Sequence, residues 1–367
     1  MQKIVTIIGA RPQFIKAAVL SHLLNQEYKE YLQEIVVHTG QHYDYAMNDV
    51  FFEEMHLPKP HYFLNINGLT HGAMTGQMLE QIEQILLSEK PDWVVVYGDT
   101  NSTLAGALAA RKLNIRLVHV EAGLRSYNPS MPEEINRILI DNMSSVLCCP
   151  SSHAVENLRK EGFFDKNRNH TVLETGDIMK DAVLFYQQFS TKPEYFEVSE
   201  KFVLATLHRA ENTDSRQNLT EIIRGLERIA EEIPVILPLH PRTHKQLLEW
   251  NILPKNILLI EPVSYLSMLW LLEHCQLVLT DSGGLQKEAY FLKKYCITLR
   301  EETEWMELVE GGFNQLTGAN ANTIQATYTF FKDKKLDNQT AFLYGNGTCA
   351  RQIVAFLLNK QSNNLTI

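Results

Sequence analysis

Two acidic residues stand at the ends of two neighbouring apolar segments. The segment WVVVYGD ends at Asp99, and the segment RLVHVEAG carries Glu121 near its end. Both segments are short and rich in valine, as buried parallel strands are, and a helical stretch over 104–113 separates them. Ligands of open α/β sheets bind outside the carboxyl ends of the strands, so we expect both carboxylates at a site of acid–base chemistry.

A glycine-rich turn in the second half of the chain is typical of a phosphate site. A buried strand over 277–280 runs into the tetrapeptide DSGG and then directly into a helix. Backbone N–H groups approach a ligand closely at such a turn, and a helix N-terminus favours negative charge. We therefore expect Ser282, Gly283 and Gly284 to bind a phosphate or diphosphate, with an ordinary helix-capping turn as the alternative. Glu288, in the first turns of the helix, is placed to bind a pair of ribose hydroxyls.

Basic and imidazole side chains follow other predicted strands. Arg11 and Lys16 follow the first strand in IIGARPQFIK, and His208 follows a strand of the second half in ATLHRAEN. Arg300 follows the strand CITL and is a candidate for binding substrate anions, with a surface ion-pair network as the alternative. A G-x-G-x-x-G pattern is missing after the first strand, which disfavours a nicotinamide cofactor there. Similar places are taken by Gln41 and His42 in TGQH, by Arg209, and by His240 after VILPL.

The segment SMPEEINRILIDN predicts a helix that begins at Pro132. Acids in a first helical turn commonly only complement the helix dipole, and this is our interpretation of Glu134. Glu133 is the stronger candidate, because the loop EAGLRSYNPSM is expected to return it near Glu121. The apolar stripe of this helix is Ile135, Ile138 and Leu139.

Composition limits the class of protein. The formal net charge of −9 argues against a nucleic-acid binder but allows an anionic small molecule in a locally basic cleft. We expect neither a membrane-spanning segment nor a signal peptide. Five cysteines without C-x-x-C spacing predict buried, reduced thiols in a cytoplasmic protein and no metal site.

Strands and helices alternate along all 367 residues, which predicts an α/β fold with parallel sheets. The polar segment over 176–200 divides the chain into two Rossmann-like domains, 1–175 and 176–350, which we expect to face each other across a cleft. The segment ARQIVAFLL within 351–367 predicts an amphipathic helix that could pack back on either domain. Strands are predicted at 4–8, 35–38, 93–97, 117–120, 146–149, 172–175, 202–207, 235–239, 257–260, 277–280 and 296–299.

Seven motifs, in order, cover almost the whole chain. They are GARP-x-x-IK at 9–16, TGQH at 39–42, GDT at 98–100, HVEAGLR at 119–125, PEE-x-NR at 132–137, HR-x-EN at 208–212 and DSGG-x-Q at 281–286. Together they resemble the non-hydrolysing UDP-N-acetylglucosamine 2-epimerases. The resemblance implies a glycosyltransferase-B type fold in which the C-terminal helix, within 351–367, returns to the first domain. It also implies a homodimer and a UDP-sugar substrate, with neither NAD nor metal. It also implies that UDP is eliminated to give a 2-acetamidoglucal, and is then added back with carbon 2 inverted.

The same resemblance implies roles for the candidate residues. The implied acid–base set is Asp99, Glu121, Glu133 and His208. The implied UDP contacts are Arg11, Lys16, Ser282, Gly283, Gly284 and Arg300 around the diphosphate, with Glu288 at the ribose. Residues that match a second, allosteric UDP-GlcNAc pocket or its border are Gln41, His42, Arg137, Arg209 and His240.

Two departures from the usual family pattern concern the choice of sugar. Trp305-Met306 stands where Arg-Pro is usual, and Lys287-Glu288 stands where two acids are usual. The segment TEWMELVE resembles a branch that acts on diacetamido-uronate UDP-sugars. UDP-GlcNAc remains the first predicted substrate, for bacterial surface polysaccharide such as O-antigen, and UDP-2,3-diacetamido-2,3-dideoxy-glucuronate is the second. Three further hypotheses are a hydrolysing 2-epimerase, a glycosyltransferase of the same fold and a non-catalytic sensor.

Overall fold

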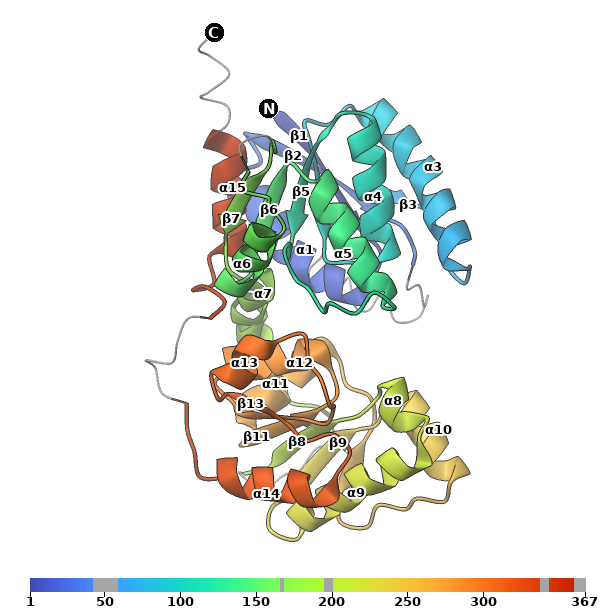
Figure 1. Ribbon diagram of the computed structural model, residues 1–367, viewed down its shortest axis with the longest axis vertical. Helices are drawn as coiled ribbons and strands as arrows, with labels where there is room; N and C mark the ends of the chain where they lie inside the picture. Colours follow the sequence, from blue (N-terminus) through green and yellow to red (C-terminus); the bar gives the residue numbers. More distant parts are fainter. Residues whose placement is uncertain (42–58, 166–167, 195–200, 337–342, 360–367) are drawn as a thin grey trace. The chain divides into compact units, whose positions relative to one another are not determined.

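The computed structural model describes residues 1–41, 59–165, 168–194, 201–336 and 343–359 (Figure 1). The chain forms two compact units: unit 1 contains Met1–Phe185 and Phe342–Ile367, and unit 2 contains Tyr186–Ala341. His42 lies outside the described residues. Within the described ranges, none of the helices has the length and apolar character needed to cross a bilayer.

Unit 1 is built on a parallel sheet of seven described strands in the order β3-β2-β1-β4-β5-β6-β7. The strands are β1 (Gln2–Ile8), β2 (Leu32–His38), β3 (Tyr62–Phe63), β4 (Trp93–Tyr97), β5 (Arg116–Val120), β6 (Val146–Cys149) and β7 (Thr171–Glu174). The helices are α1 (Arg11–Glu27), α3 (His71–Glu89), α4 (Asn101–Lys112), α5 (Pro132–Met143), α6 (Ser152–Lys160), α7 (Ile178–Tyr186) and α15 (Cys349–Asn359).

Unit 2 repeats this plan with six described parallel strands in the order β10-β9-β8-β11-β12-β13. They are β8 (Val203–Thr206), β9 (Val235–Pro238), β10 (Leu258–Ile260), β11 (Leu277–Thr280), β12 (Cys296–Thr298) and β13 (Asn314–Leu316). The helical segments are η1 (Gln187–Phe189), α8 (Ala210–Thr213), α9 (Arg216–Ala230), α10 (Pro241–Glu249), α11 (Tyr265–His274), α12 (Gly283–Phe291), α13 (Met306–Glu310) and α14 (Ala321–Phe331). The predicted α/β class with parallel sheets is confirmed.

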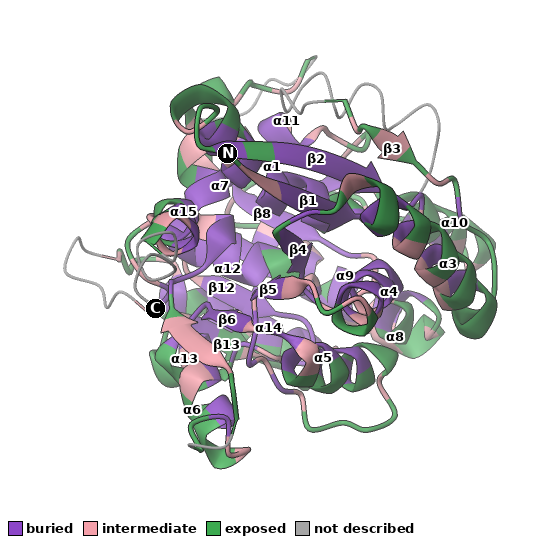
Figure 2. Cartoon of the chain, turned by 90° about the horizontal axis from the view of Figure 1, so that it is seen from above, coloured by how far each residue is buried: buried purple, intermediate pink, exposed green. Residues whose placement is uncertain are grey.

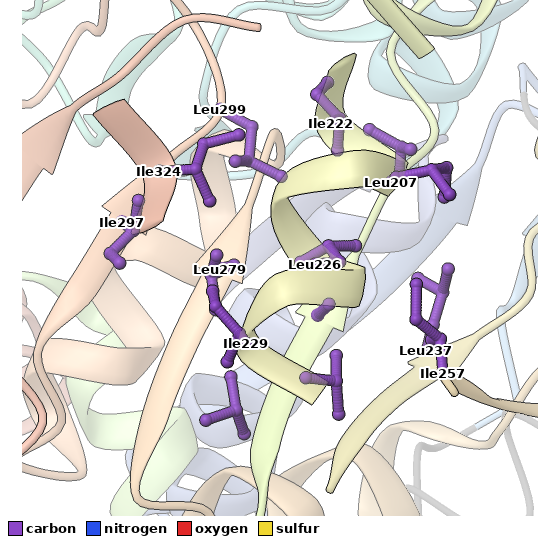
Figure 3. Close-up of a cluster of buried hydrophobic side chains, with 14 of the residues drawn as sticks. Leu207, Ile222, Leu226, Ile229, Leu237, Ile257, Leu279, Ile297, Leu299 and Ile324 are labelled. Carbon is purple, nitrogen blue, oxygen red and sulfur yellow. The ribbon is translucent and has the colours of Figure 1, made fainter. Parts of the chain in front are cut away.

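Apolar side chains at helical spacing attach the helices to the sheets. In unit 2, Ile222, Leu226 and Ile229 of α9 lie on one helical face and pack toward strand residues such as Leu237 and Leu279 (Figure 3). Most strand residues are buried, and the outer face of α3 is exposed (Figure 2). The buried faces hold the sheets rigid, so the loops at their strand ends are supported by a fixed frame.

Helix α15 belongs to unit 1, where it packs against α1 (Figure 1). Arg351 Nη2 lies 2.6 Å from Glu27 Oε1 across this contact. The start of α15 is held by Asp181 of α7, whose carboxylate accepts hydrogen bonds from the N–H groups of Cys349 and Ala350 at 3.1 and 2.9 Å. The last described helix of the chain therefore completes the unit that contains its first strand.

Both sheets reverse their strand order at one place. In unit 1, β1 lies beside β2 on one side and β4 on the other, and in unit 2, β8 lies between β9 and β11. Such a switch point leaves a crevice at the carboxyl ends of the two central strands, where α/β proteins bind ligands. The segments that follow β1, β4, β8 and β11 contain most of the candidate residues.

Candidate active site

Gln13 ties together the two central strand ends of unit 1. Its Oε1 accepts hydrogen bonds from the backbone N–H groups of Gly9 and Ala10 at 2.8 and 3.0 Å. Its Nε2 donates to the Tyr97 carbonyl at 2.7 Å and to Thr103 Oγ1 at 2.8 Å. One buried amide therefore fixes the turn after β1 against the turn after β4. Sequence reasoning did not single out this side chain.

Lys16 and Glu121 form an ion pair in this region of unit 1. Their side chains are only 11% and 8% exposed, so solvent screens the pair weakly. Glu121 has a φ of 74°, which is unusual for a residue other than glycine. The N–H groups of Glu121 and Ala122 both donate to the Cys148 carbonyl, at 3.1 and 3.0 Å, and hold this strained turn. Strain of this kind is concentrated at functional sites.

Asp99 lies against Arg137 of α5. Arg137 Nε donates to Asp99 Oδ2 at 2.8 Å, and Asn136 Nδ2 donates to the Asp99 carbonyl at 2.7 Å. Burial raises the pKa of Asp99 above its ordinary value, because desolvation outweighs the attraction of Arg137 and Lys16 while the charge of Glu121 adds to the increase. A carboxyl group with a raised pKa exchanges its proton more easily near neutral pH, as a general base or acid requires.

The two acids at the start of α5 differ in burial. Glu134 is buried and accepts hydrogen bonds from the N–H groups of Ser126 and Tyr127 at 2.9 and 3.0 Å. It also receives Arg137 Nη1 at 2.9 Å, so it joins the loop at 126–127 to the residue that holds Asp99. Glu133, the predicted catalytic acid, is exposed. Glu134 thus anchors a loop in addition to lying near the helix dipole.

The orientation of α5 departs from the usual amphipathic pattern. Its apolar stripe, formed by Ile135, Ile138 and Leu139, is exposed. The buried residues of the helix are Glu134, Asn136, Arg137, Ile140 and Asp141. The helix turns its polar side inward because that side supplies the partners of Asp99 and of the turn after β5.

A network of charged side chains, which we call the His119 network, is buried beside the Glu121 turn. His119 Nδ1 lies 2.7 Å from Asp141 Oδ1, and its Nε2 lies 2.8 Å from the Gly98 carbonyl. Arg125 Nη1 lies 2.7 Å from Asp141 Oδ2, and Arg125 Nε donates to Glu161 at 2.7 Å. The network links the backbone before Asp99 to the segment that follows Glu121.

Gln41 and Arg11 occupy the remaining described candidate positions of unit 1. Gln41 Oε1 accepts hydrogen bonds from the N–H and the hydroxyl of Ser102, at 2.9 and 2.7 Å, at the start of α4. Arg11 is exposed in the first turn of α1. Both therefore belong to the carboxyl edge of the sheet at which Asp99 also lies.

Asp281 organises the candidate residues that follow β8 in unit 2. It is buried, and its carboxylate accepts hydrogen bonds from the N–H groups of His208 and Arg209, at 3.0 and 2.9 Å. Its Oδ1 also lies 3.2 Å from His208 Nδ1. Burial lowers the pKa of His208, an effect that the charge of Asp281 opposes. With Nδ1 held by Asp281, Nε2 is the nitrogen suited to proton transfer.

His240 lies close to His208 but also has a structural task. The two ring centroids are 5.6 Å apart. His240 is the N-cap of α10, where its Nδ1 accepts a hydrogen bond from the N–H of Arg242 at 3.2 Å. Burial and the neighbouring His208 lower the pKa of His240. The structure therefore places His208 and His240, which the sequence assigns to different sets, side by side at the carboxyl edge of the second sheet.

The glycine-rich turn opens α12, as the sequence predicts. Ser282 is the N-cap residue, and its side chain makes no capping hydrogen bond. Trp305 Nε1 donates to the Gly283 carbonyl at 2.9 Å, and Lys287 Nζ lies 3.9 Å from the centre of the Trp305 ring. Glu288 is buried in the same helix. Two of the residues that depart from the usual family pattern, Lys287 and Trp305, thus contact each other beside the turn.

Arg300 is buried between two carboxylates. Its Nε donates to Glu211 Oε1 at 3.0 Å, and its Nη1 donates to Glu304 Oε2 at 3.1 Å. Arg300 therefore takes part in an ion-pair network, as the alternative prediction stated, but the side chain is buried and not at the surface. Its role in binding a substrate anion stays a prediction.

Comparisons with known proteins extend over the whole chain. A family model described as UDP-N-acetylglucosamine 2-epimerase matches residues 25–358. The chain is 51% identical to the UDP-2,3-diacetamido-2,3-dideoxy-D-glucuronate 2-epimerase of Pseudomonas aeruginosa, over 97% of this chain and 99% of that protein. It is 42% identical to Methanocaldococcus jannaschii UDP-GlcNAc 2-epimerase in a crystal structure with UDP-GlcNAc and UDP, with a TM-score of 0.85 and coverage of 97% and 99%.

A more distant likeness concerns the fold alone. The glycosyltransferase SnogD from Streptomyces nogalater aligns with a TM-score of 0.55 at 13% identity, over 97% of this chain and 99% of that chain. Together with the close structural relative, it confirms the predicted glycosyltransferase-B type of fold.

Proposed function

The chain belongs to the UDP-N-acetylglucosamine 2-epimerase family of nucleotide-sugar epimerases, and we propose that it inverts carbon 2 of a UDP-linked 2-acetamido sugar. The observation that carries this proposal is the pairing of two acids at adjacent strand ends of unit 1. Asp99, with its raised pKa, lies against Arg137, and Glu121 lies against Lys16. Each acid is held by a cationic partner, and two carboxyl groups at one edge of the sheet suit the removal and return of a proton.

The proposed reaction proceeds by elimination and re-addition. A base removes the proton from carbon 2, a double bond forms between carbons 1 and 2, and the bond from carbon 1 to the UDP oxygen breaks. UDP then adds back to carbon 1 of the 2-acetamidoglucal, and a proton is delivered to the opposite face of carbon 2. Two faces need more than one proton-carrying group, for which we propose Asp99, Glu121, Glu133 and His208.

For the departing UDP, we propose the residues that follow β11 and β12 in unit 2. The N-terminus of α12 presents backbone N–H groups at Gly283 and Gly284, which suit a diphosphate. Arg300 and Arg11 would add positive charge that stabilises the leaving group. Glu288 would bind the ribose. Lys16, which pairs with Glu121, would add a further positive charge to this set.

The choice of sugar substrate rests mainly on the 51% sequence identity with the P. aeruginosa enzyme. The relative named as a diacetamido-glucuronate 2-epimerase shares more identity with this chain than the M. jannaschii UDP-GlcNAc 2-epimerase does, at 44%. We therefore place UDP-2,3-diacetamido-2,3-dideoxy-D-glucuronate beside UDP-GlcNAc as a proposed substrate and give it the preference. In either case the product would supply an N-acetylmannosamine-type donor for surface polysaccharide.

The test is isotope exchange with both sugars. Each is incubated with the enzyme in D2O, and NMR detects deuterium at carbon 2 of both epimers. Asp99→Asn serves as the matched variant, because it keeps the shape of the side chain and removes its charge. The proposal fails if neither sugar exchanges, and accumulation of free sugar with UDP would instead indicate a hydrolysing enzyme.

We also propose a homodimer that covers the exposed stripe of α5. Ile135, Ile138 and Leu139 form a contiguous apolar face, which a second copy of the chain would remove from water. Light scattering after gel filtration should give twice the 42.1 kDa mass of the chain, and Ile138→Glu should reduce it. A wild-type monomer would exclude this part of the proposal.

We also propose a cytoplasmic location for the protein. The buried thiols of all five cysteines support this location.

A further inference from the structure

Arg300 meets an acid on each side of its guanidinium group. Its side chain is 5% exposed, and its partners Glu211 and Glu304 are 54% and 22% exposed. Burying a guanidinium group is costly unless negative charge compensates it. A diphosphate that binds Arg300 therefore competes for the guanidinium group with carboxylates that are already bound to it.

Glu304 is the carboxylate that lies over the glycine-rich turn. Gly283 has no side chain, and a Cβ atom there would collide with Glu304 Oε1. The same Cβ position is 3.7 Å from Arg209 Nη2. The acid thus lies at the first residue of α12 and pairs with Arg300, and the guanidinium group of Arg209 is near the same residue. A helix N-terminus and two arginines form an environment suited to an anion, and here a side chain of the protein supplies that anion.

We propose that Glu304 is an internal substitute for the substrate diphosphate, which it mimics in the unliganded enzyme and which displaces it on binding. This inference rests on the proposed function, because it assigns a competitor to the proposed UDP site. Between turnovers, when no diphosphate is bound, Glu304 would compensate the positive charge of Arg300 and of the N-terminus of α12. Because it must be displaced, it would weaken the binding of UDP and so favour release.

The loop that carries Glu304 is held independently of its carboxylate. Thr303 Oγ1 donates to Gln286 Oε1 at 2.7 Å, and Trp305 Nε1 donates to the Gly283 carbonyl at 2.9 Å. These bonds fix the neighbours on both sides of Glu304 to α12. Its side chain is partly exposed and can rotate toward water while the loop stays in place. The displacement therefore requires a change of rotamer rather than the unfolding of a loop.

Glu211 provides the matched comparison. It carries the same charge and binds the same guanidinium group, but it pairs with Nε and is more exposed. A general effect of negative charge near Arg300 would be removed equally by Glu304→Gln and Glu211→Gln. A specific competitor at the turn would be removed only by Glu304→Gln.

The experiment is calorimetric titration of UDP into the wild-type enzyme, Glu304→Gln and Glu211→Gln at one salt concentration. We expect Glu304→Gln to lower the Kd for UDP by about tenfold, as the loss of one like charge a few ångströms from a diphosphate should, and Glu211→Gln to change it much less. Glu304→Ala gives the same comparison without the amide and should also bind UDP more tightly.

Three results would overturn the inference or its premise. An unchanged or higher Kd in both Glu304 variants would show that Glu304 does not compete with UDP and instead supports the site. Equal tightening in the Glu211 variant would reduce the effect to general electrostatics. A wild-type enzyme that does not bind UDP would contradict the proposed function itself, so the two failures are distinguishable.

Discussion

His119 Nδ1 and Asp141 Oδ1 lie 2.7 Å apart, and both side chains are buried next to the turn that carries Glu121. Asp141 Oδ2 also accepts a hydrogen bond from the N–H of Gly123 at 3.1 Å and pairs with Arg125. The Asp141 carboxylate on α5 therefore holds His119, Gly123 and Arg125 in place around the end of β5. The geometry of the proposed acid–base site depends on a residue that takes no part in the proposed proton transfers.

Asp141→Asn should destabilise the enzyme strongly. The substitution removes one of the two carboxylates that compensate the Arg125 guanidinium group, together with the partner of His119 Nδ1, and breaking a buried ion pair costs about 3–5 kcal/mol. The free energy of unfolding from urea titration measures this cost. Glu156→Gln is the control, because it breaks an exposed pair with Arg159 and should cost about 1 kcal/mol or less. An equal loss of unfolding free energy in the two variants would show that the buried His119 network contributes no more to stability than an exposed ion pair does.

The same variant should change the acid sensitivity of the fold. Burial by itself would raise the pKa of Asp141, but hydrogen bonds and charges from His119 and Arg125 outweigh it and lower the pKa. A folded-state pKa below the unfolded value gives stability that is present above the unfolded pKa and lost as pH falls through the folded pKa. The wild type should therefore lose this stability in acid, whereas Asp141→Asn should show a flatter acid limb of unfolding free energy against pH.

Arg137→Gln should move the pH profile of the reaction. The attraction of Arg137 opposes the burial that raises the pKa of Asp99, so its removal should raise that pKa further. If Asp99 acts as the base, kcat/KM for carbon-2 exchange should rise with pH at higher values than in the wild type. Arg224→Gln, which breaks an exposed ion pair with Glu221 in unit 2, should leave the profile in place. A shift toward lower pH would contradict the assignment of Asp99.

His208 and Asp281 should act as a unit. Asp281→Asn removes the charge that opposes the lowering of the His208 pKa and weakens the hydrogen bonds to the N–H groups after β8. We expect kcat to fall by about 10²–10⁴-fold, as in other pairs where an acid orients a histidine. His208→Gln should cause a similar loss, and the double variant little more. His274→Gln, at an exposed position, is the control. Additive losses would refute a coupled pair.

Two glycines should respond to alanine in opposite directions. Gly123 has a φ of +78° beside the Glu121 turn, and a Cβ there would meet the Ala154 carbonyl at 2.5 Å. Gly123→Ala should therefore destabilise the fold and lower activity. Gly76 lies at an exposed site in α3 with open space around its Cβ position, so Gly76→Ala should stabilise the helix by about 0.5–1 kcal/mol. Thermal unfolding of the two variants measures both signs.

The positions of the chemical groups could be predicted from the sequence where they follow long apolar strands. Asp99, Glu121, His208 and the glycine-rich turn all follow such strands, and strand ends are easy to locate because burial leaves a continuous apolar pattern. The strands β3 and β13 were missed, since Tyr62–Phe63 is too short and Asn314–Leu316 too polar to show that pattern.

The supporting residues could not be predicted in the same way. Gln13 and Asp141 act through contacts with residues distant in the sequence, and nothing in their local pattern distinguishes them from ordinary polar side chains. Asp281 stands in the DSGG motif, but its contacts with His208 and Arg209 could not be derived from that motif. The outward direction of the apolar stripe on α5 has the same origin. A long-range network of Glu134, Arg137 and Asp141 determines which side of that helix is buried.

Helix α5 therefore connects two environments through a single turn. Arg137, which holds Asp99, is adjacent to Ile138, which is exposed. A molecule that covers Ile138 therefore contacts the residue next to Arg137, the ion-pair partner of Asp99. The two residues are neighbours within one helix. If the proposed homodimer provides that cover, its loss on dilution would change the position of Arg137 at Asp99, so the specific activity of the enzyme should fall as its concentration is lowered.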